Sequence, residues 1–297
     1  MKTSTYVTLI LLTTLLMGVA FPVGKIGLAY APPFLLMGCR FVLAGAVFAI
    51  ITARKPQPKG LKMWLQAAVI GLFQSAGVMG CAYFSMRWIT SAESSIITCT
   101  NPLIVIVLST IFAGAVYNKR QWIGVVIGFI GVACAFGLQM SFQPGTLISL
   151  AGACCFAVAT LLVKRWGAAF DMNVLAAYQM LAGGIALLIL SAVTEQPHFT
   201  FSLMSVTVLL WLAIMGSIVQ FSLWYFLLRS GDPGKTSAFL FLVPLFGVLS
   251  SWILLQEKVQ WYAGVGGALI CVGIFLVNWQ QKPKAKPHAA VSLMKET

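Results

Sequence analysis

Long apolar stretches, separated by short connections, dominate this sequence. Ten of them come close to the roughly 20 residues that an α-helix needs to cross the bilayer core. Only 8% of the 297 residues are charged, against about 25% in a soluble domain. The sequence therefore predicts an all-α integral membrane protein and excludes a soluble enzyme, a disordered chain and a small disulfide scaffold. The expected spans are 4–24, 32–52, 63–83, 91–114, 121–139, 144–164, 172–194, 204–228, 235–255 and 260–279.

The basic residues predict how the chain is oriented. Cytoplasmic loops of membrane proteins carry an excess of Lys and Arg, and 15 of the 19 basic residues fall at the N-terminus, in every second connection or in the tail. Lys25, Arg87 and Lys258 fall in the other connections, and Arg40 lies inside a span. This distribution predicts cytoplasmic termini and explains the net charge of +13 without nucleic acid. Residues 280–297 are expected to form a basic cytoplasmic tail near anionic lipid.

The reactive residue types form no catalytic or metal-binding pattern. All seven cysteines fall in apolar runs without metal-ligand spacing, so we expect free, buried thiols. His198 lies in a connection and His288 in the tail, where neither can act as a buried general base. The nucleotide-binding and hydrolase motifs are missing from the sequence. We therefore expect no enzyme, no cofactor and no metal, and any transport should be secondary rather than driven by ATP.

The two halves of the chain resemble each other. Units 4–139 and 144–279 each contain five expected spans, and because five is odd the second unit must cross the membrane in the opposite sense. Inverted repeats of this kind are common in secondary transporters. The alternative is a duplication that serves stability alone.

Identical residues recur when the first unit is placed on the second. We call this superposition, which needs one small adjustment between the second and third spans, the repeat alignment. It places Lys25 on Lys164, Gly45 on Gly184, Tyr83 on Tyr225, Arg87 on Arg229, Pro102 on Pro244, Gly124 on Gly266 and Gly131 on Gly273.

The matched halves also carry a family pattern. It comprises SAESSIITCTNPLIV (91–105) and QWIGVVIGFIGV (121–132) in the first half, and KTSAFLFLVPLFGV (235–248) and LQEK (255–258) in the second. With the ten spans, these stretches resemble the EamA-type branch of the drug/metabolite transporter superfamily over residues 4–279. The resemblance implies two inverted five-helix bundles around a central cavity, and export of amino acids or other small metabolites across the bacterial cytoplasmic membrane. One departure is Ala115, where the family often has an acidic residue like Glu257.

Pro102 and Pro244 are expected near the middle of their spans, at matched positions. Proline lacks a backbone donor and clashes with the carbonyl four residues earlier, so it should free the carbonyls of Thr98 and Leu240. Inside a membrane, such groups must find another partner or line a cavity. We expect two hinges beside the transport pathway. The alternative is a pair of static kinks that serve packing.

Arg40 is the charged residue expected deepest in the membrane. It lies about eight residues into its span, roughly 12 Å from the end at 1.5 Å per residue. A charge at that depth marks a functional site or a paired charge. We expect Arg40 to hold a substrate carboxylate through charge-assisted hydrogen bonds. The alternatives are a structural pair with Glu93 and hydrogen bonds to helix carbonyls.

Other polar side chains within the spans complete the expected substrate site. Glu93, the one carboxylate near a span interior, is a candidate for coupling proton entry to export, although it could equally balance Arg87 or Arg40. The repeat counterpart of Arg40 is Gln179, which is also polar. The further residues expected to bind substrate are Gln74, Tyr83, Asn101, Gln179, Gln220 and Tyr225.

We therefore predict a secondary transporter that exports amino acids or related metabolites by alternating access. A facilitator or importer of the same superfamily is one alternative, and a membrane scaffold or sensor without flux is another. The expected partners are a small-molecule substrate and membrane lipid, with no nucleic acid. The Gly124-x-x-x-Gly128 spacing permits close helix approach and would also allow a homodimer, although packing within one chain is favoured.

Overall fold

The computed structural model describes residues 3–114, 116–135, 143–230, 239–258 and 261–278, and every regular element in these ranges is a helix. The expected tail at 280–297, Ala115 and the span ends at 136–139 and 235–238 lie outside the described residues. The elements are α1 (Thr3–Gly27), α2 (Pro33–Ile51), α3 (Gly60–Gly71), η1 (Leu72–Gly77), α4 (Val78–Ser85), α5 (Ser91–Thr98), α6 (Asn101–Ala113), α7 (Lys119–Ala135), α8 (Pro144–Trp166), η2 (Gly167–Ala169), α9 (Met172–Thr194), α10 (Leu203–Ala213), η3 (Ile214–Val219), α11 (Gln220–Ser230), η4 (Phe239–Phe241), α13 (Leu242–Leu255) and α14 (Trp261–Asn278).

Seven helical segments are long and apolar enough to cross a membrane, which confirms the prediction of an all-helical, multi-span chain. They coincide with the first four expected spans and with the sixth to eighth. The three other expected spans correspond to the shorter helices α7, α13 and α14. The seven segments are Ser4–Gly27, Pro33–Ile51, Gly60–Ser85, Ser91–Phe112, Pro144–Ala169, Met172–Thr194 and Leu203–Trp224.

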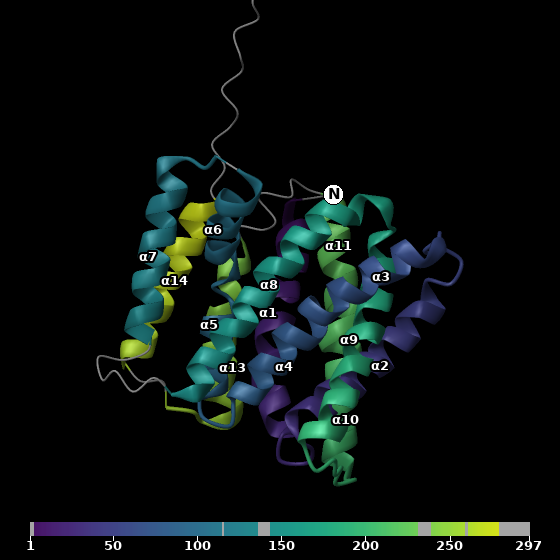
Figure 1. Cartoon of the computed structure of the whole chain (residues 1–297). Helices are drawn as coiled ribbons and strands as arrows, with labels where there is room; N and C mark the ends of the chain where they lie inside the picture. Colours follow the sequence, from purple (N-terminus) through teal and green to yellow (C-terminus); the bar gives the residue numbers. More distant parts are fainter. Residues whose placement is uncertain (1–2, 115, 136–142, 231–238, 259–260, 279–297) are drawn as a thin grey trace, which may run out of the picture.

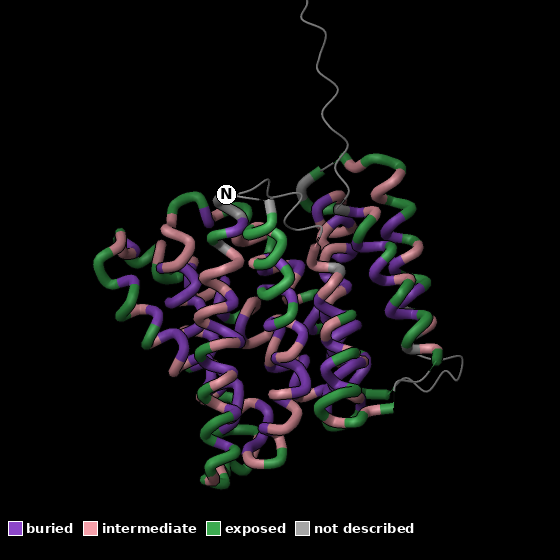
Figure 2. Tube along the Cα trace, turned by 180° about the vertical axis from the view of Figure 1, so that it is seen from behind, coloured by how far each residue is buried: buried purple, intermediate pink, exposed green. Residues whose placement is uncertain are grey.

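The helices form two groups that each combine elements of both halves of the chain (Figure 1). One group contains α5, α6, α7, α13 and α14, and the other contains α2, α3, α4, α9, α10 and α11; α1 and α8 lie between them. Buried residues lie on the inner faces and exposed ones on the outer faces (Figure 2). Large apolar side chains such as Ile50, Phe112 and Val193 are among the exposed ones, as expected for a surface that faces lipid rather than water.

Helices α2 and α9 pack closely through small residues. A Cβ atom on Gly45 would lie 2.7 Å from the backbone nitrogen of Leu181, and one on Gly184 would lie 2.7 Å from that of Val42. The repeat alignment places Gly45 on Gly184 and Val42 on Leu181. The two contacts are therefore equivalent, and each half contributes the same surface to this helix pair.

Helices α7 and α14 pack in the same way. A Cβ atom on Gly131 would lie 2.7 Å from the carbonyl oxygen of Gly266, and one on Gly124 would lie 2.8 Å from that of Gly273. These pairs exchange under the repeat alignment. A Cβ atom on Gly273 would also lie 2.8 Å from the Cα atom of Gly128. The Gly124-x-x-x-Gly128 face is thus occupied within one chain, the favoured alternative.

Two spans contain a π-helical segment where the sequence predicted a continuous α-helix. Segment η1 covers Leu72–Gly77 and η3 covers Ile214–Val219, and the repeat alignment superimposes them residue for residue. A π-helical turn contains one residue more than an α-helical turn, and such turns often occur at functional sites. Apolar periodicity does not reveal them, because both spans are apolar along their whole length.

Pro102 and Pro244 lie in the first turn of a helix and not within a continuous one, which corrects the expected geometry. A turn at Cys99–Thr100 divides the fourth span into α5 and α6, and Pro102 is the second residue of α6. Pro244 is the third residue of α13, directly after η4. Proline fits the first turn of a helix, where its missing N–H is not needed. Both spans are therefore irregular just before the proline, at matched positions, whereas movement there stays a prediction.

Candidate functional site

Arg40 lies where four segments meet in the interior of the protein. Its side chain is 1% exposed. One terminal nitrogen, Nη2, donates to the carbonyl oxygen of Gly216 at 2.6 Å, and Nε donates to the Ser217 hydroxyl at 3.0 Å. The guanidinium also lies beside the phenol oxygen of Tyr83. We call these residues, together with Ala20 of α1, the Arg40 cluster; they come from α1, α2, α4 and η3.

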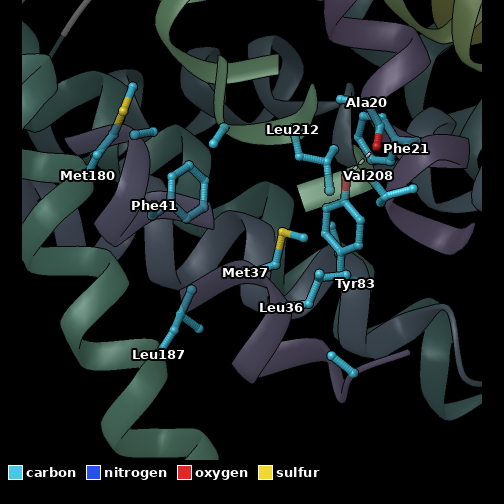
Figure 3. Packing of buried hydrophobic residues seen from close by; sticks show 14 of the residues in the cluster. Ala20, Phe21, Leu36, Met37, Phe41, Tyr83, Met180, Leu187, Val208 and Leu212 are labelled. Atoms are coloured by element: carbon cyan, nitrogen blue, oxygen red, sulfur yellow. Dashed lines mark hydrogen bonds between the residues drawn. The ribbon is translucent and has the colours of Figure 1, made fainter. Parts of the chain in front are cut away.

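Tyr83 closes the cluster from α4. Its side chain is fully buried, and its hydroxyl donates to the carbonyl oxygen of Ala20 at 2.5 Å (Figure 3). Its ring stacks on Phe21 with 6.4 Å between the ring centroids and fills the space beside the Cα atom of Gly24. Apolar side chains such as Met37 surround the ring (Figure 3). Tyr83 is therefore fixed in place, with its polar end toward Arg40.

The π-helical turn explains why η3 can accept hydrogen bonds from Arg40. In a π-helix the usual pairing of each N–H with the carbonyl four residues earlier is shifted. The Ser217 hydroxyl donates to the carbonyl oxygen of Leu212, five residues earlier, at 3.0 Å, and accepts the bond from Arg40 Nε. Within an apolar interior each such group needs a partner, and the turn and the guanidinium supply partners to each other.

The charge of Arg40 has no carboxylate partner within the described part of the chain. The two ion pairs found there join Lys55 to Asp171 at 3.2 Å and Arg87 to Glu195 at 3.4 Å. The partners of Arg40 are instead a carbonyl and hydroxyl oxygens. Of the structural alternatives, hydrogen bonding to a helix carbonyl is found and pairing with Glu93 is not. A buried cation balanced only by dipoles is costly, and it creates a positive potential that attracts an anion.

The amide residues of the predicted site fall into separate places. Gln179 is 1% exposed and makes no hydrogen bond through its side chain to the described residues; its backbone contacts Gly71, just before η1, the segment that contains Gln74. Gln220 begins α11, one turn after Ser217. The structure thus brings Gln74 near Gln179, and Gln220 near the Arg40 cluster.

Asn101 and Tyr225 do not join these groups. Asn101 is buried at the start of α6, which lies in the other helix group (Figure 1). Tyr225 lies in α11, and its side chain is outside the described part of the structure. Neither residue adds to the evidence for a central site, and both stay predictions.

Glu93 is held at a helix end. Its carboxylate accepts hydrogen bonds from the backbone N–H of Thr90 at 2.9 Å and from the Thr90 hydroxyl at 3.1 Å, and the Glu93 N–H donates back to that hydroxyl. This reciprocal arrangement is a capping box, which stabilises the first turn of α5. The geometry gives Glu93 a structural role, and proton coupling stays a prediction.

Two carboxylates that were not predicted as site residues tie the halves together. Glu195, after α9, accepts hydrogen bonds from the N–H groups of Phe34 and Leu35 at 3.2 Å each and pairs with Arg87. Glu257, after α13, accepts bonds from the N–H and hydroxyl groups of Ser91 at 3.0 and 2.9 Å. Both compensate the free N–H groups and positive dipole at a helix start. No local pattern could reveal these contacts, because the partners lie in opposite halves of the chain.

A third tie joins the connection after α2 to the start of α9. The Asp171 carboxylate accepts bonds from the N–H groups of Asn173 and Val174 at 2.9 and 3.3 Å, and from Lys55. Burial on its own would raise the pKa of Asp171, but the hydrogen bonds from Lys55 and from the two backbone N–H groups lower it below its ordinary value. Nearby, the Tyr178 hydroxyl donates to the side-chain oxygen of Gln57 at 2.7 Å.

A groove of about 660 Å³ lies away from the Arg40 cluster, between α13 and α14. Ile96 forms part of its lining, Trp252 and Gly267 line its sides, and Glu257 and Lys258 lie at one end. Of the predicted site residues, only Pro244 lines this groove. Its position between two helices with exposed apolar residues makes it a surface feature of the lipid-facing side.

The cysteines are free, as expected, but most of them are not buried. Cys271 is buried, Cys154 is exposed, and the other five are intermediate. The prediction of uniformly buried thiols is therefore wrong. An apolar residue in a lipid-facing position needs no burial inside the protein, because the lipid itself supplies an apolar environment.

The comparison with protein families gives two adjoining matches. Residues 4–137 and 143–279 each match the model of the EamA-like transporter family. Together these ranges cover nearly the whole chain, and they confirm the family resemblance predicted from the sequence pattern.

Several named proteins are similar to this chain over most of their length. The uncharacterized transporter YvbV of Bacillus subtilis is 28% identical over 93% of this chain and 92% of its own. The uncharacterized inner membrane transporter YedA of Escherichia coli is 28% identical over 83% and 82%. The chloroplastic WAT1-related protein At3g02690 of Arabidopsis thaliana is 27% identical over 89% and 67%. A solved crystal structure, 20% identical, has the same fold with a TM-score of 0.64 over 92% of this chain and 95% of that one.

Proposed function

This chain belongs to the EamA-like transporter family, and on that premise we propose that it is a secondary transporter that exports small carboxylate-bearing metabolites, such as amino acids. It is a multi-pass membrane transporter of the drug/metabolite transporter superfamily. The proposal adds a substrate class, a direction and a mechanism. An importer or facilitator, and a scaffold without flux, are the outcomes that the experiment below must separate from it.

One observation carries the substrate class. Arg40 is buried, charged and satisfied only by neutral oxygens of Gly216, Ser217 and Tyr83. A fold that needed only a packing contact here would lose little with an apolar side chain of similar volume. A carboxylate supplies the missing opposite charge and can form two parallel bonds with a guanidinium. An amino acid or a related acid therefore fits the Arg40 cluster.

The proposed mechanism is alternating access between two inverted five-span units, 4–139 and 144–279. The matched π-helical segments, the matched irregularities before Pro102 and Pro244, and the reciprocal glycine contacts of α2 with α9 support it. Two related halves with these features can exchange conformations about a central site. Pro102 and Pro244 are proposed as the hinges, at the points where the helices are already irregular.

The ties between the halves are candidates for the gates. Glu195 and Glu257 join first-half helix starts to second-half connections, and Lys55 joins Asp171 on another pair of segments. Alternating access requires such contacts to break in turn on the two sides of the membrane. With both termini in the cytoplasm, the proposed orientation puts Glu195 and Glu257 on the outer side and Lys55 on the inner side.

The remaining proposed residues complete the pathway around this centre. Gln74, Gln179 and Gln220 offer amide partners to the ammonium and carboxylate groups of a zwitterion, while Asn101 and Tyr225 are proposed further along the path. Glu93 is proposed as the proton-coupling group, and protonation there would have to weaken the capping box with Thr90. Membrane lipid surrounds the protein, and a second copy could bind through a face other than Gly124-x-x-x-Gly128.

An efflux assay tests the proposal. Bacteria that overproduce the native chain, Arg40→Met or Arg54→Met are loaded with a panel of amino acids and dipeptides, and the medium is analysed by mass spectrometry. Arg54 is an exposed arginine after α2 and serves as the matched control. We expect one carboxylate-bearing class outside the cells with the native chain and Arg54→Met, and loss of that export with Arg40→Met.

Three outcomes would contradict the proposal. Equal export with Arg40→Met would remove Arg40 from the pathway. Accumulation of the panel inside the cells would indicate an importer. No movement in either direction, with normal amounts of inserted protein, would favour a scaffold or sensor.

A further inference from the structure

The Ser217 hydroxyl connects Arg40 to the backbone of η3. It accepts the bond from Arg40 Nε at 3.0 Å and donates to the carbonyl oxygen of Leu212 at 3.0 Å. The neighbouring carbonyl of Gly216 accepts the 2.6 Å bond from Arg40 Nη2. Ser217 is fully buried, so water cannot replace these partners. The guanidinium and the π-helical turn therefore hold each other in their present geometry.

A change from the π-helical to the α-helical form of this turn would move the helix that follows. An α-helix advances by about 100° and 1.5 Å per residue, and a π-helical turn contains one residue more than an α-helical turn. Absorbing that residue into regular α-helix would rotate α11 relative to α10 by about this angle. Gln220, the first residue of α11, would change the direction in which it points.

We propose that Ser217 is a positioning residue that couples Arg40 to the shape of η3. When a carboxylate binds the guanidinium, Gly216 and Ser217 lose their donor, and the π-helical turn relaxes toward an α-helix. Substrate binding is thereby converted into a rotation of α11. This inference rests on the proposed function for the carboxylate, but the link between Ser217, Arg40 and η3 does not depend on it.

The first half of the chain provides a matched control. Ser75 occupies in η1 the position that Ser217 occupies in η3 under the repeat alignment. The counterpart of Arg40 is Gln179, which carries no charge. Ser75 is buried against Gly183 of α9, at 2.5 Å from the position of a Cβ atom on that glycine. The same π-helical turn thus exists without an arginine, and it should not respond to a carboxylate.

Hydrogen–deuterium exchange of the purified full chain in lipid nanodiscs tests the link without any ligand. The quantity measured is the exchange rate of peptides covering 212–220, divided by that of peptides covering 70–78. We expect Ser217→Ala and Arg40→Gln each to raise this ratio at least tenfold. Ser217→Cys, which keeps a weak donor of similar size, should give an intermediate value, and Ser75→Ala should not raise it.

Two results would overturn the inference: an unchanged ratio in Ser217→Ala, and a rise in both regions that leaves the ratio constant. A second arm adds a mixture of free amino acids, or the same amino acids as α-amides. The acids should raise the ratio in the native chain but not in Arg40→Gln, and the amides should have no effect. If Ser217→Ala raises the ratio but the acids do not, the positioning role stands and the proposed substrate class fails.

Discussion

Arg40 and Ser217 lie 177 residues apart in the chain, and yet Nε of Arg40 is 3.0 Å from Oγ of Ser217 in the protein interior. Each residue comes from a different half, so the contact joins the halves at their centre. The cation has no acid beside it among the described residues, and the π-helical turn that receives it has a twin without an arginine. This asymmetry within a repeated fold is the structural basis of the proposed substrate site.

Replacing Tyr83 with Phe should destabilise the protein by about 1–3 kcal/mol, because the buried carbonyl of Ala20 loses its hydrogen-bond donor. The same change removes the phenol oxygen beside Arg40. Thermal unfolding in detergent measures the effect. Tyr117→Phe is the control, since Tyr117 is half-buried in a short connection. Equal melting temperatures for native protein and Tyr83→Phe would show that this bond does not contribute.

Replacing Gly24 with Ala should also destabilise the chain, by about 1–3 kcal/mol, as overpacking of a core does. The new methyl group would overlap the ring of Tyr83, which is fully buried and cannot move aside. Gly264→Ala provides the control, because a Cβ atom there meets nothing within 4 Å. Similar unfolding temperatures for the two variants would contradict the packing described around Tyr83.

The sequence predicts the borders of several helices well and the contacts between halves poorly. The span expected at 172–194 is observed as Met172–Thr194, because Asp171 caps its start. Local hydrophobicity and capping carry that information. The bonds from Phe34 and Leu35 to Glu195 depend on how distant segments meet, and no local pattern contains them.

The site shows the same division. The depth of Arg40 within a span predicts a buried charge, and the structure confirms its burial. Its partners, Gly216 and Ser217, were missed because a π-helical turn changes neither hydrophobicity nor composition. The match of Ser75 with Ser217 under the repeat alignment was the one available signal. Pro102 and Pro244 predicted irregular helices but not the side of the proline on which the irregularity falls.

Removing the Glu195 carboxylate should weaken the start of α2. Glu195→Ala leaves the N–H groups of Phe34 and Leu35 without a partner, and we expect a loss of about 0.5–2 kcal/mol, as for a lost helix cap. Glu195→Gln keeps one acceptor oxygen and should lose less. Arg87→Met tests the exposed ion pair separately and should have a smaller effect. Chemical unfolding of the three variants decides the order, and a larger loss with Arg87→Met would contradict it.

The stability of the chain should fall at low pH in a way that depends on Asp171. Its pKa in the folded protein is lower than the ordinary value, so the ionised carboxylate stabilises the fold at neutral pH. That contribution is complete above the ordinary pKa of about 4 and is lost as the pH falls through the lowered value. Asp171→Asn should therefore melt at a lower temperature at pH 7, and the difference should shrink below about pH 4. A constant difference would show that the charge is not the cause.

The most direct test of the account uses a substrate and its uncharged twin. Proteoliposomes containing the native chain or Arg40→Met are loaded with the exported amino acid or its α-amide, and efflux is measured by mass spectrometry. Charge-assisted hydrogen bonds contribute about 1.5–3 kcal/mol, so the native protein should favour the acid over the amide by about tenfold or more. Arg40→Met should lose this preference. An equal preference for the acid in both proteins would contradict the claim that Arg40 binds the substrate carboxylate.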